Sequence, residues 1–326
     1  MKTKMTSVVT LLIATSLLFV SGCGSSSDSG ATSEDGGSKP IAVVCTTNVI
    51  KDLVRQIGGE RVAVTAIMDG PGIDPHTYTP SPRDTNALTA ADVVVYSGLH
   101  LEGQFDGALE SLNNRGIPVI CVTAALSSES PGRLIRSEGG LADPHVWFDP
   151  DLWATCGESL AAQLADFDPA GKQEYMAAAA AFAQQMAETK AAAIERLRSV
   201  PDDRRILVTA HDAFEYFSRA FQFQVEAVQG ISTESEPGLR RVNELITLLS
   251  EKKIAAVFTE QSVSDKNISA LIEGCHSRGH QLKIGGRLFS DTVGADGTPE
   301  GSLAGALLHN VNEIATALAA DAELAQ

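Results

Sequence analysis

Residues 172–199 constrain the fold most, because they read as one long helix with no Gly or Pro inside it. The larger apolar side chains recur at spacings of three, four and seven, which predicts a helix buried along one side. They are Tyr175, Ala179, Phe182, Met186, Ala193 and Leu197. At about 1.5 Å per residue such a helix is roughly 40 Å long, about the height of two stacked small domains. We therefore expect a rigid helix that connects two lobes.

Turn-forming residues mark both ends of this helix. Asp168, Pro169 and Gly171 precede it in a pattern typical of helix starts, and Pro201 follows it as a stop signal. We assign residues 168–200 to the connecting helix. The N-terminal lobe is then residues 40–167, and the C-terminal lobe is residues 201–326.

The two halves follow one plan. Short apolar strands alternate with helices in both, which predicts parallel sheets, because parallel strands need crossover connections. Residues 205–223 also repeat the strand-then-helix pattern of residues 41–59. The predicted fold class is therefore α/β, with two similar lobes that are each a parallel sheet flanked by helices, joined by one long backbone helix.

The N-terminus has the pattern of an exported lipoprotein. Two lysines precede the apolar run Val8–Val20, which is short for a membrane span and typical of a signal peptide over residues 1–22. The sequence Val-Ser-Gly-Cys that ends at Cys23 resembles a bacterial lipobox, in which the cysteine is lipidated. Residues 23–39 are rich in Gly, Ser and Asp and predict a flexible tether. The alternative is an uncleaved membrane anchor with an incidental cysteine.

Charge and cysteine usage exclude several classes of protein. The chain of 326 residues has a formal net charge of −16, and loss of Lys2 and Lys4 with the signal peptide makes it −18. Such a chain is a poor partner for nucleic acid or anionic lipid and attracts cations. The four cysteines beyond Cys23 contain no CxxC pair, which argues against a zinc ribbon and a dithiol oxidoreductase.

Four side chains stand where a ligand site is expected, in loops beyond the carboxyl ends of predicted strands. His76 and His145 lie in the first half, and His211 and Asp291 lie in the second half. Three imidazoles and one carboxylate suit Zn²⁺, Mn²⁺ or Fe²⁺ and argue against an all-oxygen calcium site. With imidazole pKa values of about 6.5, metal affinity should fall below about pH 6.

Four ordered motifs carry a family resemblance. DPHTYTPSPRD, DPHVWFDP, TAHDAFEYFSRAF and IGGRLFSDTVG together resemble the metal-binding proteins of bacterial manganese/zinc ABC importers, the TroA-like or cluster A-I family. The resemblance covers the chain from about Ile41 onward. It implies two metal-binding lobes joined by a single backbone helix, with His76, His145, His211 and Asp291 as the metal ligands.

The resemblance also implies a biological role. The protein is expected to be an extracytoplasmic solute-binding lipoprotein that captures a divalent transition metal and delivers it to a membrane permease and its ATPase. It is expected to be a monomer, lipid-anchored on the outer face of the cytoplasmic membrane or periplasmic, with no nucleic-acid partner. Dedicated zinc binders of the family have a long His-rich loop between the first two ligands, which this sequence lacks. Mn²⁺, Zn²⁺ and Fe²⁺ therefore stay open.

The alternative function is a zinc-dependent hydrolase, in which three histidines hold zinc and an open position activates water. Asp291 as a fourth ligand would close that position, and no HExxH, GxSxG or GxxxxGK[ST] motif occurs. The sequence therefore favours a binding protein. Three glutamates in loops after strands are candidates to orient the imidazoles, and the sequence does not distinguish among them. They are Glu234, Glu236 and Glu260.

Overall fold

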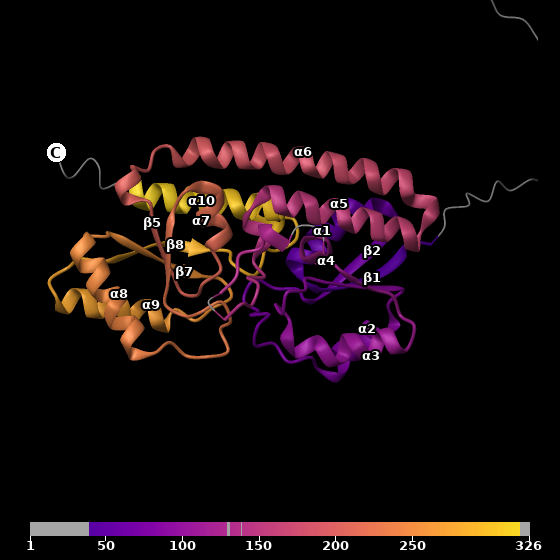
Figure 1. Ribbon diagram of the computed structural model, residues 1–326, viewed down its shortest axis with the longest axis horizontal. Coiled ribbons are helices and arrows are strands. Elements are labelled where there is room, and N and C mark those ends of the chain that lie inside the picture. The colour runs from indigo at the N-terminus through magenta and orange to yellow at the C-terminus, as the bar shows by residue number, and fades with distance from the viewer. Residues whose placement is uncertain (1–38, 129–130, 138, 320–326) are drawn as a thin grey trace, which may run out of the picture. The chain divides into compact units, whose positions relative to one another are not determined.

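The computed structural model describes residues 39–128, 131–137 and 139–319 (Figure 1). The predicted signal peptide, Cys23 and the tether before Lys39 lie outside the described residues. These described residues form one compact unit. Among the described helices, none has the length and apolar character needed to cross a membrane.

The N-terminal lobe is built on a parallel sheet with the strand order β2-β1-β3-β4. Its strands are β1 (Ile41–Thr47), β2 (Val62–Met68), β3 (Val93–Tyr96) and β4 (Val119–Cys121). Its helices are α1 (Asn48–Gly58), α2 (Pro82–Ala90), α3 (Asp106–Asn114), α4 (Ala124–Ser128) and α5 (Pro150–Phe167). The Thr47 hydroxyl accepts a hydrogen bond from the N–H of Ile50 at 3.2 Å, so α1 begins directly where β1 ends.

The C-terminal lobe repeats this order with one difference. Its strands are β5 (Ile206–Thr209), β6 (Gln224–Ala227), β7 (Ala256–Glu260) and β8 (Lys283–Leu288). They form two parallel pairs, β5 with β6 and β7 with β8. Because β5 and β7 lie next to each other, the spatial order β6-β5-β7-β8 matches that of the first lobe. The helices are α7 (Glu215–Phe221), α8 (Leu239–Lys252), α9 (Lys266–Ser277) and α10 (Leu303–Ala319).

The Glu260 carboxylate bridges β5 and β7, two neighbouring strands that are not paired by backbone hydrogen bonds. Glu260 is the last residue of β7, and its Oε1 accepts hydrogen bonds from the N–H groups of Ala210 at 2.8 Å and His211 at 2.9 Å. Side-chain bonds therefore satisfy the backbone donors just after β5. This bridge also places a buried carboxylate beside the imidazole of His211.

The predicted connecting helix is confirmed. Helix α6 (Lys172–Leu197) has 26 residues and runs along both lobes (Figure 1). Its buried side chains are the six predicted from the sequence together with Thr189. It packs against α1 and α5 of the N-terminal lobe and against α10 of the C-terminal lobe. The helix is therefore supported by both lobes along its length.

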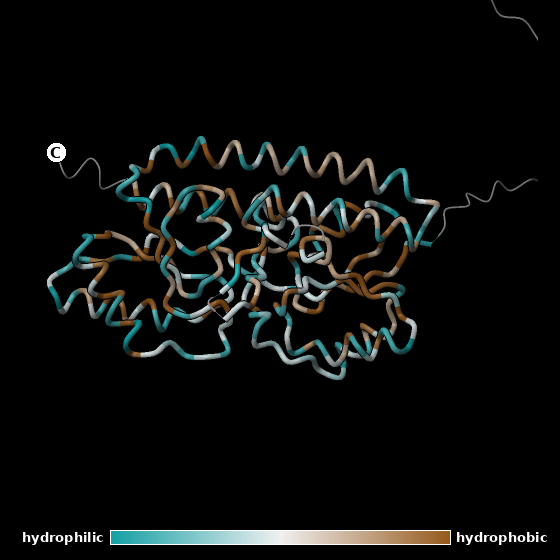
Figure 2. The backbone as a smooth tube through the Cα atoms, viewed as in Figure 1, coloured by the Kyte–Doolittle hydropathy of each residue, from teal (hydrophilic) through white to brown (hydrophobic). Residues whose placement is uncertain are grey.

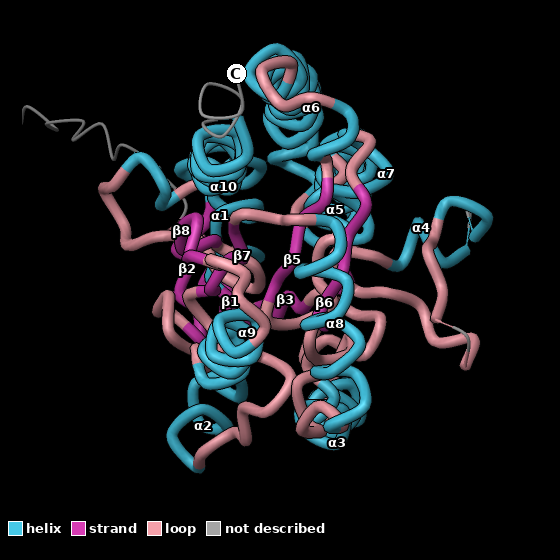
Figure 3. Tube along the Cα trace, turned by 90° about the vertical axis from the view of Figure 1, so that its left-hand side faces the viewer, coloured by secondary structure: helices cyan, strands magenta, loops and turns pink. Residues whose placement is uncertain are grey.

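One apolar core extends through both lobes beneath α6. It includes side chains of β1, α5 and α6 as well as Phe214, Phe258 and the apolar face of α10. Figure 2 shows the hydrophobic stretches concentrated on the strands and on the inner faces of the helices. Figure 3 shows the strands lying between two layers of helices, as predicted for parallel sheets. The four cysteines in the described residues are unpaired thiols, Cys45, Cys121, Cys156 and Cys275.

Candidate metal centre

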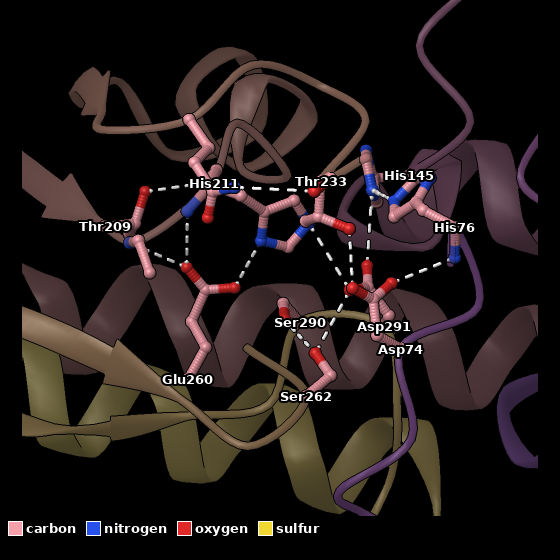
Figure 4. Close-up of polar contacts among 12 residues, drawn as sticks. Asp74, His76, His145, Thr209, His211, Thr233, Glu260, Ser262, Ser290 and Asp291 are labelled. Carbon is pink, nitrogen blue, oxygen red and sulfur yellow. Dashed lines mark hydrogen bonds and ion pairs between the residues drawn. The ribbon is translucent and has the colours of Figure 1, made fainter. Parts of the chain in front are cut away.

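The four predicted site residues converge between the two lobes (Figure 4). His76 lies in the loop after β2, and His145 lies just before the short 3-10 turn Val146–Phe148. His211 follows β5, and Asp291 follows β8. One nitrogen or oxygen of each residue lies within 4.8 Å of those of the other three, and all four side chains are buried. Residues separated by more than two hundred positions therefore form one compact donor set.

The donor atoms face a common point. Nε2 of His76 lies 3.2 Å from Nε2 of His145. Asp291 places Oδ1 3.2 Å from Nε2 of His145 and Oδ2 3.3 Å from Nε2 of His211. Nε2 of His211 and Oδ1 of Asp291 are buried and make no hydrogen bond. Buried polar atoms normally have a partner, so this arrangement fits a cation held among them.

Buried carboxylates orient two of the three imidazoles. Nδ1 of His145 contacts Oδ1 of Asp143 at 2.7 Å, and Nδ1 of His211 contacts Oε2 of Glu260 at 2.5 Å. Such contacts hold the proton on Nδ1 and leave Nε2 free to bind metal. Of the three glutamates considered from the sequence, only Glu260 contacts an imidazole of the centre. Glu234 and Glu236 are exposed.

The sequence reasoning missed Asp143, although a signal for it exists. The tripeptide Asp-Pro-His occurs twice, ending at His76 and at His145. In both copies the aspartate Oδ1 accepts a hydrogen bond from the histidine backbone N–H at 2.9 Å. The first copy also reaches across the lobes, because Oδ2 of Asp74 accepts a hydrogen bond from Thr233 at 2.5 Å. The repeated motif therefore encodes how each histidine is presented.

Aromatic side chains close one side of the centre. The ring of Trp147 meets that of His145 edge-on, with centroids 5.4 Å apart, and Trp147 and Phe148 are fully buried. Tyr78 has another role, since its ring stacks on Phe105 and its hydroxyl donates to Asp84. The wall beside His145 excludes water and raises the strength of electrostatic interactions there.

A sequence profile described as the zinc-uptake complex component A, periplasmic, matches residues 43–317. The chain belongs to this component A family. It is 41% identical to the manganese-binding lipoprotein MntA of Bacillus subtilis over 301 residues, which cover 92% of this chain and 95% of that protein. It is 39% identical to the zinc-binding protein TroA of Treponema pallidum over 282 residues, or 86% of this chain and 89% of that protein.

Solved structures of component A relatives have the same fold. The periplasmic zinc-binding protein TroA from Treponema pallidum matches with a TM-score of 0.82 at 37% identity. That match covers 86% of this chain and all of the TroA chain, at 100%. The predicted fold class of two α/β lobes joined by one long helix is thereby confirmed.

The three histidines of the centre differ in the direction in which their surroundings shift their pKa values. Burial lowers the pKa of His76 to about 3, despite the nearby charge of Asp291. Burial alone would also lower the pKa of His145, but Asp143 and Asp291 outweigh it and raise that pKa to about 9. At His211, burial is likewise outweighed by Glu260 and Asp291, which raise the pKa well above its ordinary value. Without metal, this centre therefore holds protons on His145 and His211 at neutral pH.

Asp291 has the complementary shift. Burial would raise its pKa, but His211 and His145 lower it well below the ordinary value for an aspartate. The carboxylate is thus ionised at neutral pH beside two protonated imidazoles. Two protons carry the same charge as one divalent cation, so exchanging them leaves the charge of the buried centre unchanged. The buried centre therefore avoids the cost of holding excess charge away from water.

A cavity between the lobes borders the centre at His76. Its volume is about 500 Å³, and His76 is the candidate ligand that lines it. The other lining side chains come from both lobes and are mostly apolar, among them Leu99, Leu141 and Ile231. Asp212, next to His211 in the sequence, is the carboxylate on this wall. This cavity gives a dissolved ion a path to the edge of His76.

Proposed function

We propose that this protein captures one divalent transition-metal ion, Mn²⁺ or Zn²⁺, between its lobes and delivers it to a membrane permease. The buried convergence of three imidazoles and one carboxylate supports this proposal most directly. The family consists of substrate-binding components of metal ABC importers, which implies a permease and an ATPase as partners. The metal is therefore cargo that the protein binds and releases.

The ligands in this proposal are Nε2 of His76, His145 and His211 and the carboxylate of Asp291. The three imidazole nitrogens suit Fe²⁺ and Zn²⁺, and the anionic carboxylate oxygen makes the set suitable for the harder ion Mn²⁺ as well. The relatives MntA and TroA are named for manganese and for zinc, respectively. By the Irving–Williams order, Zn²⁺ should bind more tightly than Mn²⁺ in vitro, whichever ion is delivered in the cell.

Membership of the family decides between a binding protein and a zinc hydrolase. Its members are substrate-binding proteins of transporters, so this protein is a binder and not an enzyme. The expected result is binding of one Zn²⁺ or Mn²⁺ per chain at equilibrium, with no turnover of ester, peptide or phosphate substrates. Dialysis against labelled metal measures the first quantity, and chromogenic substrates measure the second. Metal-dependent turnover would contradict the proposal.

Relatives named as lipoproteins and as periplasmic proteins place this chain in the cell envelope. We propose, more specifically, that residues 1–22 are a cleaved signal peptide and that Cys23 carries the lipid. Residues 23–39 would then tether two lobes, residues 40–167 and 201–326, that are joined by residues 168–200. We also propose that the protein acts as a monomer.

Replacement of the lipidation site tests this anchoring. Cys23→Ala should release the protein from the membrane fraction, because stable anchoring requires the lipid once the signal peptide is removed. The measurement is fractionation of cells that express the wild type or the variant, with Cys121→Ala as the matched control that stays bound. A Cys23→Ala protein that is cleaved and still membrane-bound would contradict the proposed anchor.

A further inference from the structure

Asp291 is held in place from the opposite lobe. It follows β8 of the C-terminal lobe, yet the residues on both sides of it are hydrogen-bonded to the N-terminal lobe. Before Asp291, the carbonyl of Ser290 accepts a hydrogen bond from Nε1 of Trp147 at 2.9 Å. After Asp291, Thr292 and Val293 are bonded to Asn48, which lies 245 positions before Val293 in the sequence.

Asn48 makes a two-point contact with this segment. Its Nδ2 donates to the carbonyl of Val293 at 3.0 Å, and its Oδ1 accepts from the N–H of Val293 at 3.2 Å. Nδ2 also donates to Oγ1 of Thr292 at 2.9 Å. The Asn48 side chain is buried, at 3% exposure. An amide that pairs with both the N–H and the carbonyl of one residue fixes its position and its orientation.

The same helix holds the rest of the segment. Asn48 is the first residue of α1, and one turn later the carboxylate of Asp52 accepts a hydrogen bond from the N–H of Leu303 at 2.9 Å. Lys51 and Arg55 both pair with Asp296, at 3.0 and 2.8 Å. Helix α1 therefore binds the segment that follows Asp291 at several points along its length.

The C-terminal lobe makes its own contacts with the segment. Asn310 of α10 pairs with the N–H and carbonyl of Phe289 at 2.9 and 2.7 Å, and Ser262 donates to Oδ2 of Asp291 at 3.1 Å. The histidines differ in this respect. His211 is oriented by Glu260 within its own lobe, whereas the peptide that follows Asp291 is bonded to the opposite lobe.

We propose that Asn48 is a positioning residue for metal binding. It fixes the peptide after Asp291 to the N-terminal lobe and thereby sets the distance from the Asp291 carboxylate to His76 and His145. This inference rests on the proposed function, because it assumes that Asp291 is a metal ligand. Asn48 itself lies outside the donor set and acts only through Asp291.

A double-mutant cycle tests this role. Asn48→Ala should lower Zn²⁺ affinity by about 10- to 100-fold, the usual effect of removing a residue that orients a ligand. In an Asp291→Ala background the same change should cost less than about threefold, because non-additivity is the mark of residues that act through one another. Competition with a zinc-binding dye measures all four proteins. Equal losses in the two backgrounds would overturn the inference.

Asn310→Ala is the matched control. Asn310 is also a buried asparagine that pairs with both backbone groups of one residue in the same segment, but from the C-terminal lobe. It should lower the melting temperature of the metal-free protein about as much as Asn48→Ala does, while Zn²⁺ affinity changes less than about threefold. An affinity loss equal to that of Asn48→Ala would remove the specific role of Asn48.

A second variant and the Asp291→Ala protein distinguish the remaining outcomes. If Asn48→Ala does not fold, Thr292→Val removes one hydroxyl bonded to Asn48 while preserving side-chain shape, and its smaller affinity loss should likewise vanish in the Asp291→Ala background. If Asp291→Ala alone keeps wild-type affinity, the proposed ligand set is wrong. If Asp291→Ala weakens binding and the Asn48 effect is additive, only the positioning role is wrong.

Discussion

Binding of one divalent ion at pH 7 is expected to release about two protons from the protein. The protons come from His145 and His211, because Asp143, Glu260 and Asp291 raise the pKa values of these imidazoles in the metal-free centre, that of His145 to about 9. His76 contributes none, since its pKa is about 3. Calorimetric titration in buffers of different ionisation enthalpy gives the number directly. His145→Ala should lower it by about one.

The same shifts set the pH range in which affinity changes. Metal binds the deprotonated imidazole. A proton therefore competes with the metal at each histidine when the pH is below the pKa of that histidine in the metal-free protein, and it no longer competes when the pH is above that pKa. For His145 that limit is about pH 9. Where both histidines are protonated, affinity should rise by about a hundredfold per pH unit, so it should still be rising between pH 7 and 9. Ordinary imidazoles of pKa about 6.5 would leave affinity flat there, and a flat profile would contradict this account.

The second large effect is expected when Glu260 is replaced, because this residue has both a structural and an electrostatic role. Its Oε1 accepts backbone N–H groups of Ala210 and His211, and its Oε2 contacts the imidazole of His211. Glu260→Gln keeps a carbonyl oxygen for the backbone donors and removes the negative charge. We expect the pKa of His211 to fall, the release to drop from about two protons to about one, and affinity to fall roughly 10- to 100-fold.

Glu260→Ala removes both parts. The N–H groups of Ala210 and His211 then lose their acceptor in a buried place, which should destabilise the metal-free protein by about 2–4 kcal/mol. Chemical denaturation without metal measures this loss, and Glu260→Gln should lose much less. Glu234→Gln is the control, because Glu234 is an exposed glutamate of a neighbouring loop. Release of two protons by Glu260→Gln would show that Glu260 does not set the charge of His211.

Local patterns were sufficient to predict the fold and the convergence of four candidate ligands. The stripe on α6 follows from helical periodicity, and the parallel order follows from alternating strands and helices. Because the carboxyl ends of parallel strands meet at one edge, His76, His145, His211 and Asp291 were expected to converge although they are far apart in the sequence.

The residues that orient and tune the ligands depend on tertiary contacts. Glu260 reaches His211 because β5 and β7 are neighbours, which the sequence does not state, and Glu234 was an equal candidate on sequence alone. The contact between Asn48 and Val293 joins two lobes across 245 positions. The raised pKa values of His145 and His211 were not predicted either, because the pKa of an isolated imidazole does not include the effect of neighbouring carboxylates. Asp143 was also missed, although the repeated Asp-Pro-His motif is a local signal for it.

The metal-induced shift in melting temperature shows whether these four side chains hold one ion. A nanomolar ligand present at micromolar concentration adds about 4 kcal/mol to the stability of the native state, which is a shift of several degrees. The proteins to compare are the wild type, four single variants of the proposed ligands, and His100→Ala, an exposed histidine of the same cavity. The ligand variants are His76→Ala, His145→Ala, His211→Ala and Asp291→Asn. We predict that each ion, Zn²⁺ or Mn²⁺, raises the melting temperature of His100→Ala as much as that of the wild type. Each ligand variant should lose most of this shift. Wild-type shifts in all four ligand variants would place the metal elsewhere and contradict the account.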